Sequence, residues 1–245
     1  MKKIIPNAIT SLNLLSGCMA LVFVFKDDFM TAAYFLLFAV LFDFCDGLFA
    51  RILHAYSKLG LELDSLADLI SFGVVPAAML HRVLAISNDD LLKIPLLGIL
   101  IYGFPFFIAV FSALRLAKFN IDERQHDSFL GLPTPANAIF IVATVIAASK
   151  YQFIHNILYN DISIVILTIV MSALMICELP MFSLKVKFNE TGKQILDKNI
   201  TQIMFLIISL IFIILLGFAG ISLSIILYIL ISTVKTILKN KTNKL

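Results

Sequence analysis

Long runs of apolar residues, separated by short polar breaks, fill most of the chain. A helix needs about 20 residues to cross a hydrocarbon core of about 30 Å. We therefore predict an all-α, polytopic membrane helix bundle with about eight transmembrane helices. The predicted spans are 8–25, 29–50, 62–86, 94–117, 132–149, 161–179, 201–219 and 221–238.

The largest polar break, at residues 181–200, separates six predicted helices from a final pair. Residues 201–234 carry no charged side chain. We therefore divide the chain into a six-helix membrane core at 1–180 and a second part at 181–245. The second part is predicted to be a cytoplasmic linker and a C-terminal transmembrane hairpin with a basic tail. The hairpin is expected to serve packing or oligomer contact, and a homodimer is compatible with it.

Composition agrees with this pattern, since 60% of the residues are hydrophobic, 14% are charged and the mean hydropathy is +1.00. A soluble domain of this size does not hide so much apolar surface. With a cytoplasmic amino terminus, 15 of the 19 Lys and Arg residues fall on the cytoplasmic side. The positive-inside rule then predicts a multi-pass protein of the cell membrane. The net charge of +3 reflects this topology, so nucleic-acid binding is not expected.

Acidic residues interrupt the apolar pattern in one stretch, "LFDFCDGLFARILHAYSKLGLELDSLADLISFG", residues 41–73. Asp43 and Asp46 are three positions apart, and Asp64 and Asp68 are four apart, so each pair shares one face of a helix. The short connection between the two helices holds them antiparallel. The four carboxylates are therefore predicted to converge near the cytoplasmic ends of the second and third spans.

Such carboxylates need a compensating charge, because one charged residue costs roughly 2.5–3.5 kcal/mol at the centre of a membrane helix. Only Arg51 and Lys58 lie nearby in sequence with the opposite charge. Carboxylate oxygens without His or Cys are hard ligands that suit Mg²⁺, Mn²⁺ or Ca²⁺. We predict a divalent metal site, with two ions. A divalent-cation transporter is an alternative, but the same helices are apolar toward their outer ends, which leaves no visible path.

Small residues and an arginine share the predicted acidic face. Gly47 and Gly60 have no side chain where a ligand would approach the backbone. Ala50 adds only a methyl group to the same face. Arg51, at the cytoplasmic end, can pair with a phosphate through its planar guanidinium group. Together with the carboxylates, these residues indicate phosphoryl transfer on a lipid.

This stretch resembles the signature of the CDP-alcohol phosphatidyltransferase family, D-x2-D-G-x2-A-R-x8-G-x3-D-x3-D, and matches it without a gap or a substitution. The matching residues are Asp43, Asp46, Gly47, Ala50, Arg51, Gly60, Asp64 and Asp68. The resemblance implies a six-helix core with a polar cavity facing the cytoplasm. It also implies transfer of a phosphatidyl group from CDP-diacylglycerol to an alcohol, with release of CMP.

The resemblance further implies a role for each of these residues. Asp43, Asp46 and Asp64 would hold one metal ion, and Asp43, Asp64 and Asp68 the other. Asp68 would also act as general base. The CDP-diacylglycerol site would be formed by the first six signature residues, Asp43, Asp46, Gly47, Ala50, Arg51 and Gly60.

Other segments resemble the members of this family that use L-serine as the acceptor, namely 5–13, 64–77, 114–120, 129–138 and 178–187. Serine carries a carboxylate and no phosphate, so its pocket needs a modest set of cations. The candidate serine-binding residues are Arg115, Lys118 and Asn120, at the end of the fourth span. This set does not exclude a phosphate, so glycerol 3-phosphate and inositol phosphate remain alternative acceptors.

Overall fold

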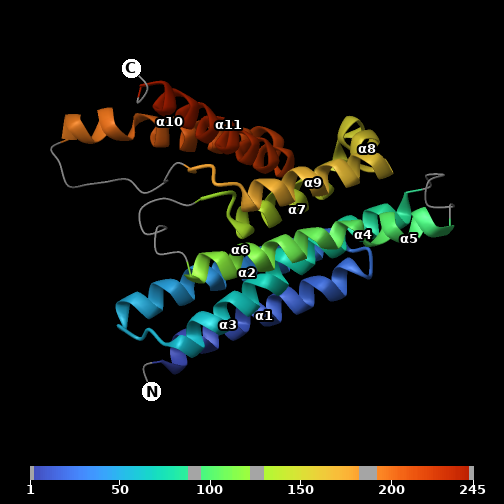
Figure 1. Cartoon of the computed structure of the whole chain (residues 1–245), viewed down its shortest axis with the longest axis horizontal. Coiled ribbons are helices and arrows are strands. Elements are labelled where there is room, and N and C mark those ends of the chain that lie inside the picture. Colours follow the sequence, from blue (N-terminus) through green and yellow to red (C-terminus); the bar gives the residue numbers. More distant parts are fainter. Residues whose placement is uncertain (1–2, 88–94, 122–129, 182–191, 243–245) are drawn as a thin grey trace.

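Helices make up almost all of the described structure, a computed structural model that covers residues 3–87, 95–121, 130–181 and 192–242. Within these residues, the pairing of Leu130 with Pro180 is an isolated β-bridge. The helices are α1 (Ile4–Val24), α2 (Phe29–Ile52), α3 (Lys58–Asp68), α4 (Val75–Ile86), α5 (Pro95–Gly103), α6 (Phe107–Ile121), α7 (Thr134–Lys150), α8 (Gln152–Leu158), α9 (Asp161–Ile176), α10 (Gly192–Leu216) and α11 (Phe218–Thr242). The chain runs back and forth along the long axis of the molecule (Figure 1).

Every predicted span coincides with a helical segment, but fewer than eight meet a strict test of length and composition. In the described part of the chain, five helical segments are long and apolar enough to cross a membrane, and α8 with α9 makes a sixth if this pair, bent by 82°, is one span. The two remaining segments, α7 and Ile200–Leu216, are apolar but shorter than 18 residues. The protein is thus a polytopic helical membrane protein, with five or six spans by this test where the sequence predicted about eight.

Side-chain caps set where several helices begin. Asp28 accepts a hydrogen bond from the Thr31 N–H at the start of α2, 3.0 Å away, and this bond holds the pKa of the Asp28 carboxyl below its usual range. Ser57 accepts from the Gly60 N–H at the start of α3. Such caps satisfy amide groups that have no partner within the helix. The cap at Ser57 lies about two turns before Asp64, which fixes the register of the acidic face.

The third predicted span is not a uniform α-helix. Directly after Asp68, the chain forms a π-helical segment, Leu69–Val74, before it continues as α4. Pro76, in the first turn of α4, suits the start of a helix because it has no N–H to leave unpaired. π-helical turns inside α-helices occur frequently at functional sites. The change of helix type therefore falls next to a predicted catalytic residue.

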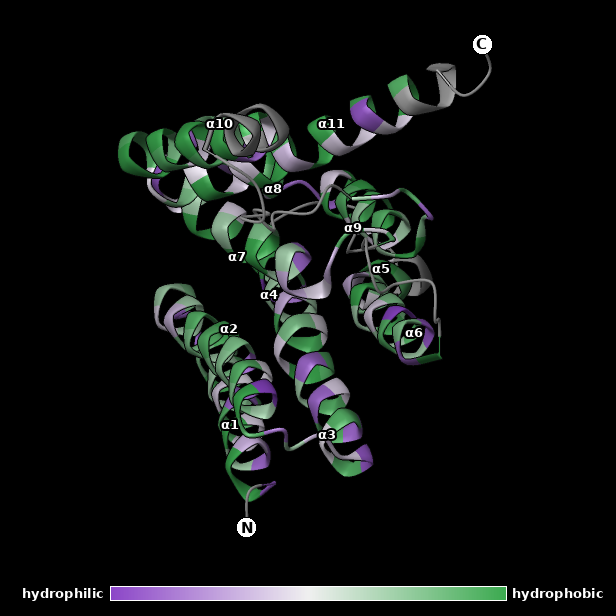
Figure 2. Ribbon diagram, turned by 90° about the vertical axis from the view of Figure 1, so that its left-hand side faces the viewer, coloured by the Kyte–Doolittle hydropathy of each residue, from purple (hydrophilic) through white to green (hydrophobic). Residues whose placement is uncertain are grey.

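The interior of the bundle is rich in small side chains. Ala20, Ala32, Ala39 and Ala77 are fully buried, as expected where membrane helices approach closely. Many large apolar side chains face outward on the same helices. Figure 2 shows hydrophobic colouring along most of the ribbon and a concentration of hydrophilic residues on α3. The outer surface is thus suited to lipid, and polarity gathers at one end of the bundle.

The C-terminal hairpin packs directly on the core. α11 contacts α7, and the Thr144 hydroxyl donates a hydrogen bond to Ser222 Oγ, 3.0 Å away. At Gly220, an added Cβ would collide with the backbone of Phe212, so the two helices of the hairpin approach closely there. The division at residue 180 remains a prediction, since the linker at 182–191 lies outside the described residues.

Candidate active site

Three of the four predicted carboxylates converge. Asp43 comes from α2, and Asp64 and Asp68 come from the last two turns of α3. Each offers one carboxylate oxygen to a group in which all three oxygens lie within 4.8 Å of one another. This spacing suits ligands that share a cation, because carboxylate oxygens sit 2.0–2.6 Å from Mg²⁺ or Ca²⁺.

Asp46 lies outside this three-residue group and faces a neighbouring cavity. Its side chain is buried and lies close to Thr10 of α1. One oxygen of Asp46, Oδ2, and one of Asp64, Oδ1, are buried without a hydrogen-bond partner among the described residues. Buried carboxylate oxygens are costly unless a donor or a cation satisfies them. The donor set and these two oxygens therefore fit divalent cations between α2 and α3.

A cavity of about 210 Å³ opens beside the carboxylates, between α1, α2 and α3. Its lining includes six signature residues, which are Asp46, Gly47, Ala50, Arg51, Gly60 and Asp64. A Cβ added at Gly47 would meet no atom within 4 Å, so the backbone is open there, as predicted. At Gly60, in contrast, an added Cβ would lie 3.0 Å from both Asn7 Oδ1 and Ser57 Oγ. Gly60 therefore also permits close packing of α3 against α1.

Sequence reasoning missed the contribution of α1 and of the loop between α2 and α3 to this cavity. The additional lining residues are Pro6, Asn7, Thr10, Ala55, Tyr56, Ser57 and Leu61. A signal was available, because polar residues recur at positions 7, 10 and 13 of an otherwise apolar first span, and this spacing places them on one helix face.

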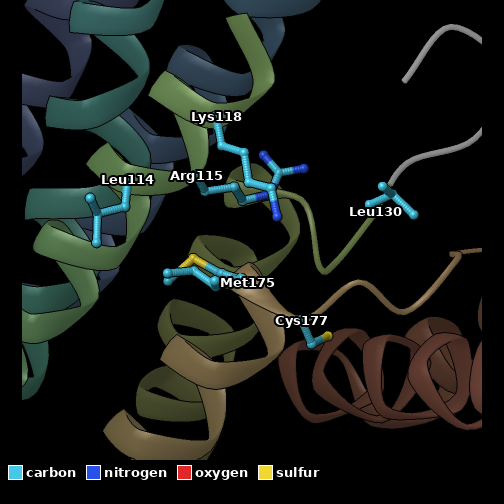
Figure 3. A pocket seen from close by; sticks show the side chains of 7 residues that line it. Leu114, Arg115, Lys118, Leu130, Met175 and Cys177 are labelled. Carbon is cyan, nitrogen blue, oxygen red and sulfur yellow. The ribbon is translucent and has the colours of Figure 1, made fainter. Parts of the chain in front are cut away.

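A second cavity, of about 300 Å³, lies between α6 and the end of α9. Figure 3 shows the side chains of Arg115 and Lys118 extending from α6 into this space, with Leu130 and Cys177 on the opposite side. Arg115 is 8% exposed, and its Nε has no hydrogen-bond partner among the described residues. A buried guanidinium with a free donor is suited to bind an anion.

The three candidate serine-binding residues do not stay together. Lys118 is half exposed and forms an ion pair with Glu178, 3.0 Å away. Asn120 does not line the cavity with Arg115, because its amide instead donates to Ser65 Oγ on α3, 2.8 Å away. Since Asn120 follows Arg115 by five positions, helical rotation turns it toward α3. Of the three, the structure brings only Arg115 and Lys118 together.

Asp68 lies between the two cavities and interacts with charged residues of both. Asp68 belongs to the carboxylate group next to the first cavity, and it is close enough to Arg115 of the second cavity to interact with its charge. Asp68 is only 8% exposed. A buried carboxylate is thus flanked by a candidate metal site on one side and a cation on the other.

These features define a helical membrane protein with an acidic site between its helices and two neighbouring cavities. Residues 3–182 match the model of the CDP-alcohol phosphatidyltransferase family, and the chain belongs to that family. The match covers all four Asp residues and both cavities, whereas the C-terminal hairpin lies beyond it.

Several curated relatives carry the name CDP-diacylglycerol–serine O-phosphatidyltransferase. The protein from Bacillus subtilis (strain 168) is 33% identical over 175 residues, which cover 71% of this chain and 88% of the relative. The protein from Methanocaldococcus jannaschii is 30% identical over 167 residues, covering 68% and 70%. The protein from Helicobacter pylori (strain 26695) is 31% identical over 153 residues, covering 62% of this chain and 61% of the relative. The match therefore spans about three fifths of the Helicobacter protein.

Proposed function

We propose that this protein transfers the phosphatidyl group of CDP-diacylglycerol to the hydroxyl of L-serine, giving phosphatidylserine and CMP. The observation that carries the proposal is the convergence of Asp43, Asp64 and Asp68 beside the cavity lined by the family signature. The names of the relatives support serine as the acceptor. The reaction would serve phospholipid biosynthesis in the cell membrane, with the site facing the cytoplasm.

The first cavity is the proposed site of the CDP-linked headgroup. Arg51, exposed at its mouth, would pair with a phosphate oxygen through its guanidinium group. Gly47 leaves space for the nucleotide next to the backbone. Asn7 and Thr10 add neutral polar groups from α1, which suit the base and sugar better than they suit a phosphate.

Asp43, Asp46 and Asp64 would hold one divalent ion, and Asp43, Asp64 and Asp68 a second, with Mg²⁺ or Mn²⁺ the proposed metals. When bound, such ions neutralise the diphosphate and the leaving phosphate of CMP. Asp68 would take the proton of the serine hydroxyl as its oxygen forms the new bond to phosphorus. The bond from that phosphorus to the oxygen of CMP then breaks, and CMP leaves with the bonding electrons.

The second cavity is the proposed acceptor site. Arg115 would bind the serine carboxylate through the nitrogen that lacks a protein partner. Because Lys118 is already paired with Glu178, this cavity offers less net positive charge than a phosphate dianion requires. That balance favours serine over glycerol 3-phosphate or inositol phosphate. The electrostatic attraction between Arg115 and Asp68 would favour a serine position with its hydroxyl near Asp68.

A direct assay tests the proposal. Purified protein in detergent would be given CDP-diacylglycerol, Mg²⁺ or Mn²⁺ and one acceptor at a time, and both CMP and the lipid product would be measured. We expect CMP release and phosphatidylserine with L-serine alone. If turnover with glycerol 3-phosphate or inositol phosphate equals or exceeds turnover with L-serine, the proposal that serine is the acceptor is wrong. Size measurement of the same sample would show whether the protein is a homodimer, as we also propose.

A further inference from the structure

Asp68 is held by a residue that the signature does not contain. Asn13 of α1 is fully buried, and its side-chain Nδ2 donates a hydrogen bond to Asp68 Oδ1, 3.1 Å away. The bond joins residues 55 positions apart in sequence. It occupies one oxygen of Asp68 with a neutral donor, so the other oxygen is left to receive a metal ion or a proton.

The amide of Asn13 is itself oriented by Ser71. The Ser71 hydroxyl donates to Asn13 Oδ1, 2.8 Å away, and also lies 3.2 Å from the backbone oxygen of Asn13. An ionised carboxylate can only accept, so the amide nitrogen must face Asp68 and the amide oxygen must face a donor. Ser71 provides that donor and is fully buried. Two hydrogen bonds therefore fix which end of Asn13 faces Asp68.

The close approach of α1 to the π-helical segment depends on Gly17. An added Cβ at Gly17 would collide with Ser71 Oγ and lie 3.0 Å from Ser71 Cα. Ser71 belongs to the π-helical segment that begins directly after Asp68. Gly17 thus gives Ser71 the room that it needs beside α1, and through Ser71 it maintains the contact between Asn13 and Asp68.

We infer that Asn13 is a positioning residue, which holds Asp68 in the orientation needed for metal binding and proton transfer, and that Ser71 positions Asn13. This inference rests on the proposed function, because it takes the role of Asp68 from it. Partners that orient a ligating carboxylate contribute roughly 10- to 100-fold to metal affinity or activity. A different explanation is that Asn13 and Ser71 only join two helices, as polar side chains do in membranes.

Three variants separate these explanations: Asn13→Leu, Ser71→Ala and the double variant. Leu branches at Cγ as Asn does but is larger and has no donor, and the thermal midpoint shows whether the helices still pack. The matched control is Ser222→Ala, which removes a hydroxyl from another interhelical hydrogen bond, with Thr144, far along the chain from the carboxylates. Each protein would be purified in detergent, and its thermal midpoint, its Mn²⁺ affinity by electron paramagnetic resonance and its kcat for CMP release would be measured.

For Asn13→Leu we expect kcat and Mn²⁺ affinity to fall roughly 10- to 100-fold. In Ser71→Ala, kcat and Mn²⁺ affinity should each fall roughly 5-fold, which corresponds to the loss of one neutral hydrogen bond. Ser222→Ala should have wild-type kcat and Mn²⁺ affinity. Because Ser71 acts through Asn13, the double variant should equal Asn13→Leu alone. Wild-type kcat and Mn²⁺ affinity in Asn13→Leu would overturn the inference. So would a double variant whose loss of kcat is the product of the two single losses, or a Ser222→Ala variant that loses as much kcat as Ser71→Ala.

Failure of the proposed function gives a different result. If the wild-type protein releases no CMP with any acceptor, the proposed reaction is wrong. The Mn²⁺ arm still tests Asn13, because it needs no substrate. Should Asn13→Leu not fold, the comparison of Ser71→Ala with Ser222→Ala carries the same test in both kcat and Mn²⁺ affinity.

Discussion

The two cavities that flank Asp68 differ in charge and in how the chain builds them. The first, next to the carboxylates, takes its polar residues from α1, α2 and α3 and from the loop between the last two. The second takes Arg115 and Lys118 from α6, and its opposite wall comes from Leu130 and from residues 175–177 at the end of α9. The first is acidic and the second is basic.

Under the proposed function, the first cavity would bind the CDP-linked donor and the second the acceptor. The lining of the acidic cavity includes six of the eight residues of the family signature. The basic cavity depends on side chains outside the signature, including Lys118, whose charge is balanced by Glu178. We therefore expect substitutions in the first cavity to abolish the reaction and substitutions in the second to change acceptor use.

The largest effect is expected from Asp43→Ala or Asp64→Ala. Each removes a member of the carboxylate group, so CMP release should fall to background, and added Mn²⁺ should no longer raise the thermal midpoint. Metal that binds the folded state raises wild-type stability by mass action, and excess chelator should remove both this stabilisation and the activity. Glu62→Ala is the control, since Glu62 lies on α3 but is exposed. Retained activity in the Asp43 or Asp64 variant would show that these ligands are assigned wrongly.

Asp68→Asn should come next, with kcat lowered by roughly 10² to 10⁴, the usual worth of a positioned base. Asn keeps the size and one metal-facing oxygen but cannot accept the proton, so the low turnover should remain at saturating Mn²⁺ while CDP-diacylglycerol still binds. The measurement is CMP release as a function of Mn²⁺ concentration. If excess metal restores turnover, Asp68 is a ligand only and the base must be sought elsewhere.

Arg115→Ala should raise the KM for serine by roughly 10- to 100-fold, because a charged hydrogen bond is worth about 1.5–3 kcal/mol. The KM for CDP-diacylglycerol should change much less. Lys118→Ala is the matched comparison on the same helix, and a smaller effect is expected since Lys118 is exposed and paired. Equal changes in the KM for serine and the KM for CDP-diacylglycerol would indicate that Arg115 stabilises the fold and does not bind the acceptor.

Asn120→Ala should have the smallest effect. Its amide contacts Ser65 on α3 and not the second cavity, so the KM for serine should stay within about 2-fold of wild type, and the thermal midpoint should fall slightly through the lost hydrogen bond. A large rise in the KM for serine would return Asn120 to the acceptor site and would weaken the contrast between the cavities.

The helical segments and the acidic helix faces could be predicted from the sequence because both depend on residues close together along the chain. Hydrophobic runs located the helical segments, and the spacing of the four Asp residues predicted that their carboxylates converge. The structure brings Asp43, Asp64 and Asp68 together, whereas Asp46 lies outside their group. Helical periodicity and one short connection are enough for that prediction. The sequence predicted about eight spans, and five or six of the described segments meet the test of length, because α7 and the apolar part of α10 are shorter than 18 residues.

Tertiary structure decided which residues from distant helices meet. Asn120 was grouped with Arg115 by proximity in sequence, yet five positions of helical rotation turned it toward α3. Asn13 belongs to the polar face of α1, but the sequence contains no signal that pairs it with Asp68. Only packing at Gly17 brings Asn13 and Ser71 to Asp68. Periodicity fixes the face of one helix, whereas the pairing of faces depends on how whole helices pack.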